Sequence, residues 1–238
     1  MENNLDLGQH FMKDEEILEK VVNSSEIKND EIVLEVGSGE GDLSKKILEK
    51  NPRELICVEI DSRFKIYDDR ISFIQGNILE EIEDITFDNF VANIPYHISE
   101  PLLIKLILRR TKKINMVCGK KFADALFGDS IIGLITRFSY DIVLVETISP
   151  EKFIPPPKVN SALVTLRYKK ESDIFLTFYE HQKQKVKNYI LTISEGKKTK
   201  NEVKLLSETI ADLLDKNLYT LNLEEYKQLY NFINNNLL

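Results

Sequence analysis

Short apolar runs alternate with amphipathic stretches over about the first 170 residues of the chain. Apolar runs of this length, rich in β-branched residues and separated by helical periodicity, predict a mostly parallel β-sheet with connecting helices. Helices are expected to start after Asp14, near Asp42 and near Ile98. The pattern therefore predicts an α/β, Rossmann-like fold. Its seven strands are expected over residues 31–36, 55–60, 71–75, 87–93, 114–118, 141–148 and 163–168.

The pattern changes after about residue 170, where strand-like runs vanish. Apolar residues now recur at helical spacing over residues 175–193, 201–216 and 223–233. We therefore expect two domains, an α/β domain over residues 1–170 and a small helical domain over residues 171–238.

The segment Asn93-Ile94-Pro95-Tyr96 directly follows a buried-strand pattern. Pro95 removes a backbone donor and favours an extended conformation for the residue before it. In open α/β sheets, ligands bind at the carboxyl ends of the strands. The Asn93 amide and the Pro95 carbonyl both offer oxygens that accept from an amine, and Tyr96 offers a flat face on which a base can stack. These four residues alone also fit an ordinary strand exit, so the neighbouring motifs decide.

Three glycines spaced G-x-G-x-G begin at Gly37, between the first predicted strand and a helix. They let the backbone approach a cofactor, although a tight turn alone would also explain them. The spacing differs from the dinucleotide fingerprint, and the acid Glu35 suits a cationic ligand better than a pyrophosphate. Glu59, which follows about 20 residues later, is placed to accept ribose hydroxyls. Asn77, after the third strand, can hydrogen-bond an adenine ring.

Charge is distributed unevenly along the chain, whose formal net charge is −7. Residues 1–100 carry a net −14, residues 101–200 a net +10 and residues 201–238 a net −3. A basic middle segment in an acidic chain is typical of a surface that faces a polyanion, although lysines also simply solvate helices. The candidate residues for binding such a polyanion are Arg109, Arg110, Lys112, Lys113, Lys120, Lys121 and Lys158.

The two cysteines, Cys57 and Cys118, lie in apolar runs and provide neither a disulfide framework nor a zinc-binding spacing. A reducing, cytoplasmic setting without a metal is therefore expected. The polar and acidic start, Met1-Glu2-Asn3-Asn4, does not resemble a signal peptide. No apolar run approaches the roughly 18 residues that a membrane span needs.

Four motifs occur in a specific order within residues 7–168, and together they resemble the ribosomal RNA adenine N6,N6-dimethyltransferase family. The family's opening element is similar to Gly8-Gln9-His10-Phe11-Met12, and its cofactor loop is similar to Glu35-Val36-Gly37-Ser38-Gly39-Glu40-Gly41. Its third motif is similar to Asn93-Ile94-Pro95-Tyr96-His97-Ile98-Ser99, and its fourth to Phe153-Ile154-Pro155-Pro156-Pro157-Lys158-Val159-Asn160-Ser161-Ala162. Asn77 departs from the family pattern, which usually has Asp there.

The resemblance implies a class I methyltransferase that uses S-adenosyl-L-methionine to dimethylate N6 of adenosines in small-subunit rRNA, on a pre-ribosomal particle and as a monomer. It implies that Asn93, Pro95 and Tyr96 are catalytic and that Tyr96 and Phe153 stack the target base. It also implies that the candidate polyanion-binding residues and the helical domain contact RNA. The expected cofactor-binding residues are Gln9, His10, Met12, Glu35, Gly37, Gly39, Glu59, Ile60, Asn77 and Asn93.

Three alternatives share these features. Two are enzymes with the same chemistry, namely an adenine methyltransferase of large-subunit rRNA and a DNA adenine methyltransferase. The third is a ribosome-assembly factor that keeps the fold and binds RNA without catalysis. The departure at Asn77 keeps this third alternative open.

Overall fold

The computed structural model describes residues 9–169 and 174–237 and divides into two compact units. The first unit comprises Met1–Asp124 and Ser139–Lys170, and the second comprises Ala125–Phe138 and Glu171–Leu238. Ala125–Phe138, which the sequence assigned to the α/β domain, thus groups with the helical unit. One physical reason is the Phe138 ring, which lies 5.7 Å from the ring of Tyr230.

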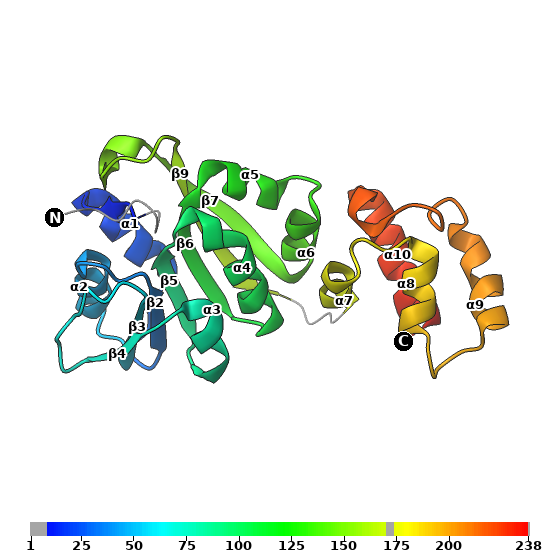
Figure 1. The fold of residues 1–238 in the computed structure, drawn as a ribbon, viewed down its shortest axis with the longest axis horizontal. Coiled ribbons are helices and arrows are strands. Elements are labelled where there is room, and N and C mark those ends of the chain that lie inside the picture. The colour runs from blue at the N-terminus through cyan, green and yellow to red at the C-terminus, as the bar shows by residue number, and fades with distance from the viewer. Residues whose placement is uncertain (1–8, 170–173, 238) are drawn as a thin grey trace. The chain divides into compact units, whose positions relative to one another are not determined.

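A seven-stranded sheet forms the centre of the first unit (Figure 1), in the order β4-β3-β2-β5-β6-β9-β7. The strands from β2 to β6 run parallel, whereas β9 runs antiparallel to both of its neighbours. The expected seven-stranded, mostly parallel sheet is confirmed. The strands are β2 (Ile32–Val36), β3 (Glu54–Glu59), β4 (Ile71–Gln75), β5 (Asn89–Asn93), β6 (Lys113–Gly119), β7 (Tyr140–Ile148) and β9 (Ser161–Tyr168).

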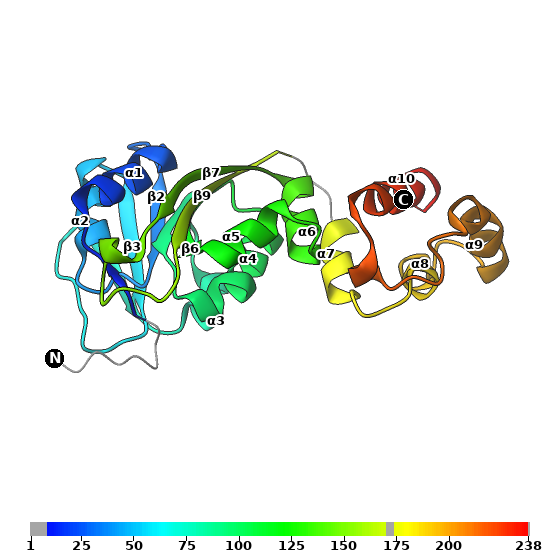
Figure 2. The ribbon, with the colours of Figure 1, turned by 90° about the horizontal axis from the view of Figure 1, so that it is seen from above.

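Helices cover both faces of this sheet. Figure 2 shows α1 (Glu15–Ser25) and α2 (Asp42–Glu49) on one face, with α3 (Ile78–Glu81) and α4 (Ser99–Leu108) on the other. Because both faces are covered, the central strands are apolar on both sides, as is usual for parallel sheets. The predicted cap of α1 is confirmed, since the Asp14 side chain accepts from Ile17 N at 3.1 Å.

The start of α4 agrees with the helix start expected near Ile98. Helix α4 is preceded by a 3-10 turn over Tyr96–Ile98, and its first residue is Ser99 itself. The Ser99 hydroxyl donates back to the Pro95 carbonyl at 3.4 Å. The turn therefore keeps the strand-end motif compact where the chain leaves β5.

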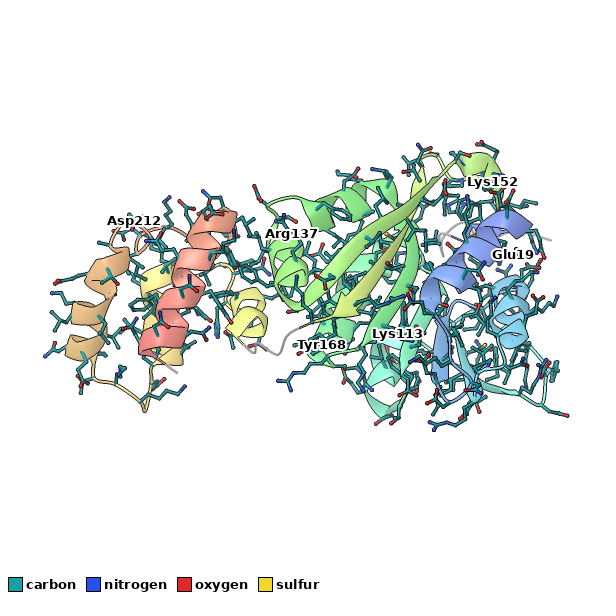
Figure 3. The ribbon with its side chains drawn as sticks, turned by 180° about the vertical axis from the view of Figure 1, so that it is seen from behind. Glu19, Lys113, Arg137, Lys152, Tyr168 and Asp212 are labelled. Carbon is teal, nitrogen blue, oxygen red and sulfur yellow. The ribbon has the colours of Figure 1, made fainter. Side chains whose placement is uncertain are left out.

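Different residues lie at the carboxyl and amino edges of the sheet. Val36, Glu59, Gln75 and Asn93 end parallel strands, so they meet at the carboxyl edge. In Figure 3, Lys113 lies near the opposite, amino edge, where β6 begins. A two-stranded sheet of β1 (Phe11–Met12) and β8 (Phe153–Ile154) joins the start of the described chain to the proline-rich segment.

The second unit is helical, but the first two predicted helical stretches are divided or shortened, whereas the last extends beyond its predicted end at residue 233. The stretch predicted over 175–193 is interrupted near Lys185, which forms an isolated β-bridge with Asn217. Capping boxes at Thr199 and Asn222 start the last two α-helices. Helix α5 (Lys120–Phe127) leads into this unit, and its other α-helices are α6 (Ile131–Ser139), α7 (Ile174–Glu180), α8 (Val186–Ile193), α9 (Lys200–Leu206) and α10 (Leu223–Asn236).

Candidate active site

A cavity opens at the carboxyl edge of the sheet. Its empty volume, counted with the open space at its mouth, is about 860 Å³. Its walls come from the ends of β2, β3, β4 and β5 and from the residues that precede and form β1. The lining residues are Gln9, His10, Phe11, Val36, Gly37, Gly39, Val58, Glu59, Ile60, Gly76, Asn77, Ile78, Asn93, Ile94, Pro95, Tyr96, His97 and Ile98.

The glycine loop after β2 forms one wall of the cavity. Gly39 has a φ of +50°, and a Cβ placed on it would lie 2.8 Å from a ring atom of Phe11. A side chain is excluded there both by the backbone conformation and by the Phe11 ring. Phe11 also packs edge-on against Phe64, with ring centroids 5.4 Å apart. Phe11 therefore lines the cavity, although no role was predicted for its side chain.

Glu59, at the end of β3, is held by the backbone around it. Its two carboxylate oxygens accept from Gly39 N and Asp61 N, each at 2.9 Å. The side chain lines the cavity although only 4% of the residue is exposed. Each carboxylate oxygen retains acceptor capacity, so this carboxylate can still receive hydroxyl donors. Ile60, 56% exposed, adds an apolar wall beside it.

Asn77 lines the cavity but also caps α3. Its side-chain oxygen accepts from Leu79 N at 3.1 Å, and its side-chain nitrogen donates to Glu80 at 2.9 Å. This explains why an asparagine is stable here, since Asn is among the best N-cap residues. The oxygen keeps a second lone pair that can face a ligand.

Two residues predicted to bind the cofactor do not line the cavity. Met12 is 4% exposed and packs into the core between the sheet and its helices. Glu35 is 1% exposed, and its carboxylate accepts from the Ser44 hydroxyl at 2.5 Å and from the Cys57 thiol at 3.4 Å. Burial raises the pKa of Glu35 to about 7. Glu35 thus ties β2 to the first turn of α2, a placement that the motif does not reveal.

The segment of residues 9–13 lines the cavity and forms hydrogen bonds with residues that are remote in sequence. The Gln9 amide donates to Asp61 at 2.7 Å, and the Arg63 guanidinium beside Asp61 lowers the pKa of that carboxyl. The His10 ring nitrogen Nδ1 lies 2.8 Å from the Pro155 carbonyl. Because a carbonyl only accepts, His10 Nδ1 carries the proton in this contact.

Asn93, the last residue of β5, is oriented by the same segment. Its side-chain nitrogen Nδ2 donates to the His10 backbone carbonyl at 2.8 Å. Because a carbonyl only accepts, the end of the Asn93 amide that faces His10 must be the nitrogen. Within residues 9–169 and 174–237, no group donates to Asn93 Oδ1. The amide oxygen is therefore an available acceptor at the cavity wall.

The Pro95 carbonyl is already engaged. It accepts from Ile98 N at 3.1 Å and from the Ser99 hydroxyl at 3.4 Å, so it serves the 3-10 turn. The sequence assigned this carbonyl as the second acceptor for a substrate amine. Two donors already occupy its two lone pairs, which argues against that role.

Tyr96 is the first residue of this turn and lines the cavity. Its hydroxyl lies 2.6 Å from the Ser161 hydroxyl, and its ring centroid lies 5.8 Å from that of His10. Burial raises the pKa of the Tyr96 hydroxyl, while the contact with Ser161 opposes that shift. The ring is therefore fixed at both ends, by its backbone turn and by its hydroxyl.

Phe153 does not form the second stacking wall that the sequence predicts. It is 2% exposed, pairs with Met12 in the β1–β8 sheet and belongs to the hydrophobic core. Alternation along the strand turns the next residue, Ile154, outward, where it is 58% exposed. The described structure therefore contains one predicted aromatic wall at the cavity, Tyr96, and an unpredicted one, Phe11.

The predicted RNA-binding residues separate into two groups. Those in the first group, Arg109, Arg110, Lys112 and Lys113, lie at the amino edge, remote along the strands from the cavity. Arg109 donates to the carbonyls of Glu83 and Ile85 at 3.1 and 2.5 Å. Lys113 donates to the Glu31 carboxylate at 2.7 Å. These two cations are thus committed to internal contacts.

Those in the second group lie at the carboxyl edge with the cavity. Lys120 and Lys121 directly follow β6, and Lys158 lies in the loop before β9. The Lys120 backbone N–H donates to the Asn160 carbonyl at 2.9 Å, which brings the two segments together. Lys120 pairs with Asp124, whereas the Lys121 and Lys158 side chains are exposed.

A family model described as ribosomal RNA adenine dimethylase matches residues 1–234 of the chain. The chain belongs to this family. A probable ribosomal RNA small subunit methyltransferase A from Methanococcus aeolicus is 29% identical, and the match covers 98% of this chain and 99% of the relative. A ribosomal RNA small subunit methyltransferase from Arabidopsis thaliana is 34% identical over 71% of this chain and 55% of the relative. The sequence-based family assignment, and with it the expected adenine methyltransferase class, is confirmed.

Solved structures agree on the fold. A dimethyladenosine transferase from Plasmodium falciparum superposes with a TM-score of 0.72 at 24% identity, over 95% of this chain and 98% of that one. The 23S rRNA methyltransferase ErmE superposes with a TM-score of 0.62 at 20% identity, over 94% and 99%. The part of the chain that the structure describes contains no cluster of three or more metal-ligating side chains and no helix able to span a membrane.

Proposed function

We propose that this member of the adenine dimethylase family transfers methyl groups from S-adenosyl-L-methionine to N6 of adenosines in small-subunit rRNA, giving N6,N6-dimethyladenosine. The observation that carries the proposal is the Asn93 amide, whose nitrogen is held by His10 so that its oxygen is offered at the cavity. Several relatives are named small-subunit rRNA methyltransferases, which supports this choice of substrate.

The cofactor half of the cavity fits the proposed cofactor. Glu59 retains acceptor capacity for ribose hydroxyls, Ile60 adds an apolar wall, and Gly39 leaves the backbone open to close approach. Asn77 has a free lone pair for an adenine amino group. When bound, the cofactor supplies an electrophilic methyl group on a sulfonium.

The acceptor half activates the amine by hydrogen bonding. The lone pair of N6 is delocalised into the adenine ring, so this nitrogen is a weak nucleophile. Asn93 Oδ1 accepts one N6 hydrogen and holds it out of the ring plane, which restores lone-pair character. Because the Pro95 carbonyl serves the 3-10 turn, we assign the second acceptor to the carbonyl of Ile94, which lines the cavity. Orientation of the amine then supplies much of the rate.

Tyr96 stacks on the target base after the base leaves its helix. Lys121 and Lys158, exposed at the same edge, contact phosphates and position the RNA without reading its sequence. We assign a similar role to Lys197, Lys198 and Lys200 of the helical unit. We further propose that the protein acts as a monomer on a pre-ribosomal particle in the cytoplasm, where buried, unpaired Cys57 and Cys118 persist as thiols.

The test uses purified protein, cofactor labelled on its methyl group, and ribosomal subunits that lack the modification. We expect label on adenosines of small-subunit rRNA as N6,N6-dimethyladenosine, identified by nucleoside mass spectrometry and mapped by primer extension. Label on large subunits alone would contradict the substrate assignment. Calorimetry that detects cofactor binding without any transfer to either subunit would contradict the proposed reaction.

A further inference from the structure

Ser161 is a fully buried serine at the start of β9, and its hydroxyl lies 2.6 Å from the Tyr96 hydroxyl. The two residues are 65 positions apart in sequence. Ser161 pairs with Gly119 of β6 on one side and with Ile148 of β7 on the other. The hydroxyl therefore projects from backbone that is fixed by two strands, which makes it a rigid anchor.

Gly119 supports the face of the same ring. A Cβ placed on Gly119 would lie 3.5, 3.6 and 3.7 Å from the three Tyr96 ring atoms Cγ, Cδ2 and Cδ1. Nearly equal distances to adjacent ring atoms mean that the ring lies with one face over this glycine. The backbone of β6 thus covers one face of Tyr96, so the proposed stacked base would lie on the opposite face.

We infer that Ser161 is a positioning residue for methyl transfer, which sets the plane of the Tyr96 ring relative to Asn93; this inference rests on the proposed function. Tyr96 leaves the strand end through a short 3-10 turn, so its backbone fixes only one end of the ring. The contact with Ser161 fixes the other end. An adenine stacked on the ring inherits its plane, and the direction of its N6 hydrogens toward Asn93 follows from that plane.

The same contact explains why a tyrosine, rather than a phenylalanine, suits this position. A phenyl ring stacks on a base as well as a phenol does, so stacking alone does not require the hydroxyl. The hydroxyl adds a tether to a buried, otherwise apolar sheet edge, where a single net hydrogen bond changes an equilibrium by about three- to tenfold.

The experiment is a double-mutant cycle of Ser161→Ala and Tyr96→Phe, with single-turnover methyl transfer to small subunits as the measurement. Each single variant is expected to slow transfer by about three- to tenfold, with cofactor affinity by calorimetry unchanged. The double variant is expected to be no slower than either single variant, because both remove the same contact. Ser161→Thr, which keeps a hydroxyl, is expected to restore most of the rate.

Ser25→Ala is the matched control. Ser25 is also fully buried and hydrogen-bonded, to the Val22 carbonyl at 2.6 Å, but it lies at the end of α1, away from the cavity. We expect it to lower stability without slowing transfer. Losses that multiply in the double variant, or a Ser161→Ala enzyme with the full rate, would overturn the positioning role while leaving the proposed function intact. A wild-type protein that methylates no small subunits would overturn both.

Discussion

Strand β5 begins with Asn89 and ends with Asn93, and the two side chains differ in how many of their polar atoms are hydrogen-bonded. Asn89 is fully buried; its nitrogen donates to the Ser25 carbonyl at 2.9 Å, and its oxygen accepts from Asn115 at 3.0 Å. Asn93 donates through its nitrogen to the His10 carbonyl at 2.8 Å, but within the described parts of the chain its oxygen receives no donor.

The difference teaches how to tell a structural polar group from a functional one. At the amino edge, the polar network is closed, because Arg167 also donates to Asn115 at 3.1 Å and to the Ser24 carbonyl at 2.6 Å. At the carboxyl edge, the Asn93 amide is held by its nitrogen, and its oxygen receives no donor from the described residues. Asn93 is half-buried, and its oxygen is marked as a ligand acceptor by its place at the cavity wall and by the fixed orientation of the amide.

The largest expected effect is that of Asn93→Ala. We expect methyl transfer to fall by about a hundredfold or more, because the oriented acceptor is lost. Cofactor affinity and the urea midpoint are expected to change little, since only one hydrogen bond to the fold is removed. Single-turnover transfer and calorimetry measure the two effects. Transfer at the normal rate would show that Asn93 is no more functional than Asn89.

Asn89→Ala is expected to lower stability without slowing methyl transfer. The substitution removes the hydrogen bonds that join Asn89 to Asn115 and to the Ser25 carbonyl, at a cost of about 2–4 kcal/mol in the free energy of unfolding. Urea denaturation measures this loss. The rate of transfer per folded molecule is expected to stay at the wild-type value, and a large fall in that rate would break the distinction between the two edges.

The comparison extends to two acids near the ends of neighbouring strands, Glu35 inside the fold and Glu59 at the cavity. Burial raises the pKa of Glu35 from 4.5 to about 7, so the folded state binds its proton more tightly than the unfolded state. Its contribution to stability is therefore full below about pH 4.5 and is lost as the pH rises through about 7.

We therefore expect Glu35→Gln, which keeps an acceptor for Ser44, to gain stability relative to the wild type as the pH rises from 5 to 8. Urea unfolding of both proteins across this range measures the difference. A constant difference would mean that Glu35 is ionised in the fold throughout.

Glu59→Gln, in contrast, is expected to weaken cofactor binding, because a carboxylate accepts hydroxyl donors more strongly than an amide.

The smallest effect is expected for a pair of exposed lysines at the two edges. Lys121→Ala, at the carboxyl edge, is expected to weaken RNA binding a few-fold and to reduce the slope of log affinity against log salt by about one. Lys112→Ala, at the amino edge, removes the same charge and is expected to change neither. A salt titration of binding to small subunits measures both, and equal effects would reject the assignment of RNA to the carboxyl edge.

The strand segments and the glycine loop could be predicted from sequence because local pattern determines them. The orientation of Phe153 could not, because the β1–β8 pairing sets which side of that two-residue strand faces inward. The split of the basic residues follows from strand direction, since a helix end before β6 and a helix start after it lie at opposite edges. No sequence signal marks the His10 carbonyl as the partner of Asn93, because every residue carries such a carbonyl.

That last contact makes the acceptor dependent on a peptide remote in sequence. The amide of Asn93 is aligned only while the segment of residues 9–13 is docked, and the same segment contributes Gln9 and Phe11 to the cavity. A ligand that packs against this segment is therefore expected to stabilise the alignment of the acceptor as well. The two halves of the cavity thus share one backbone segment, which lines the cavity and also orients Asn93.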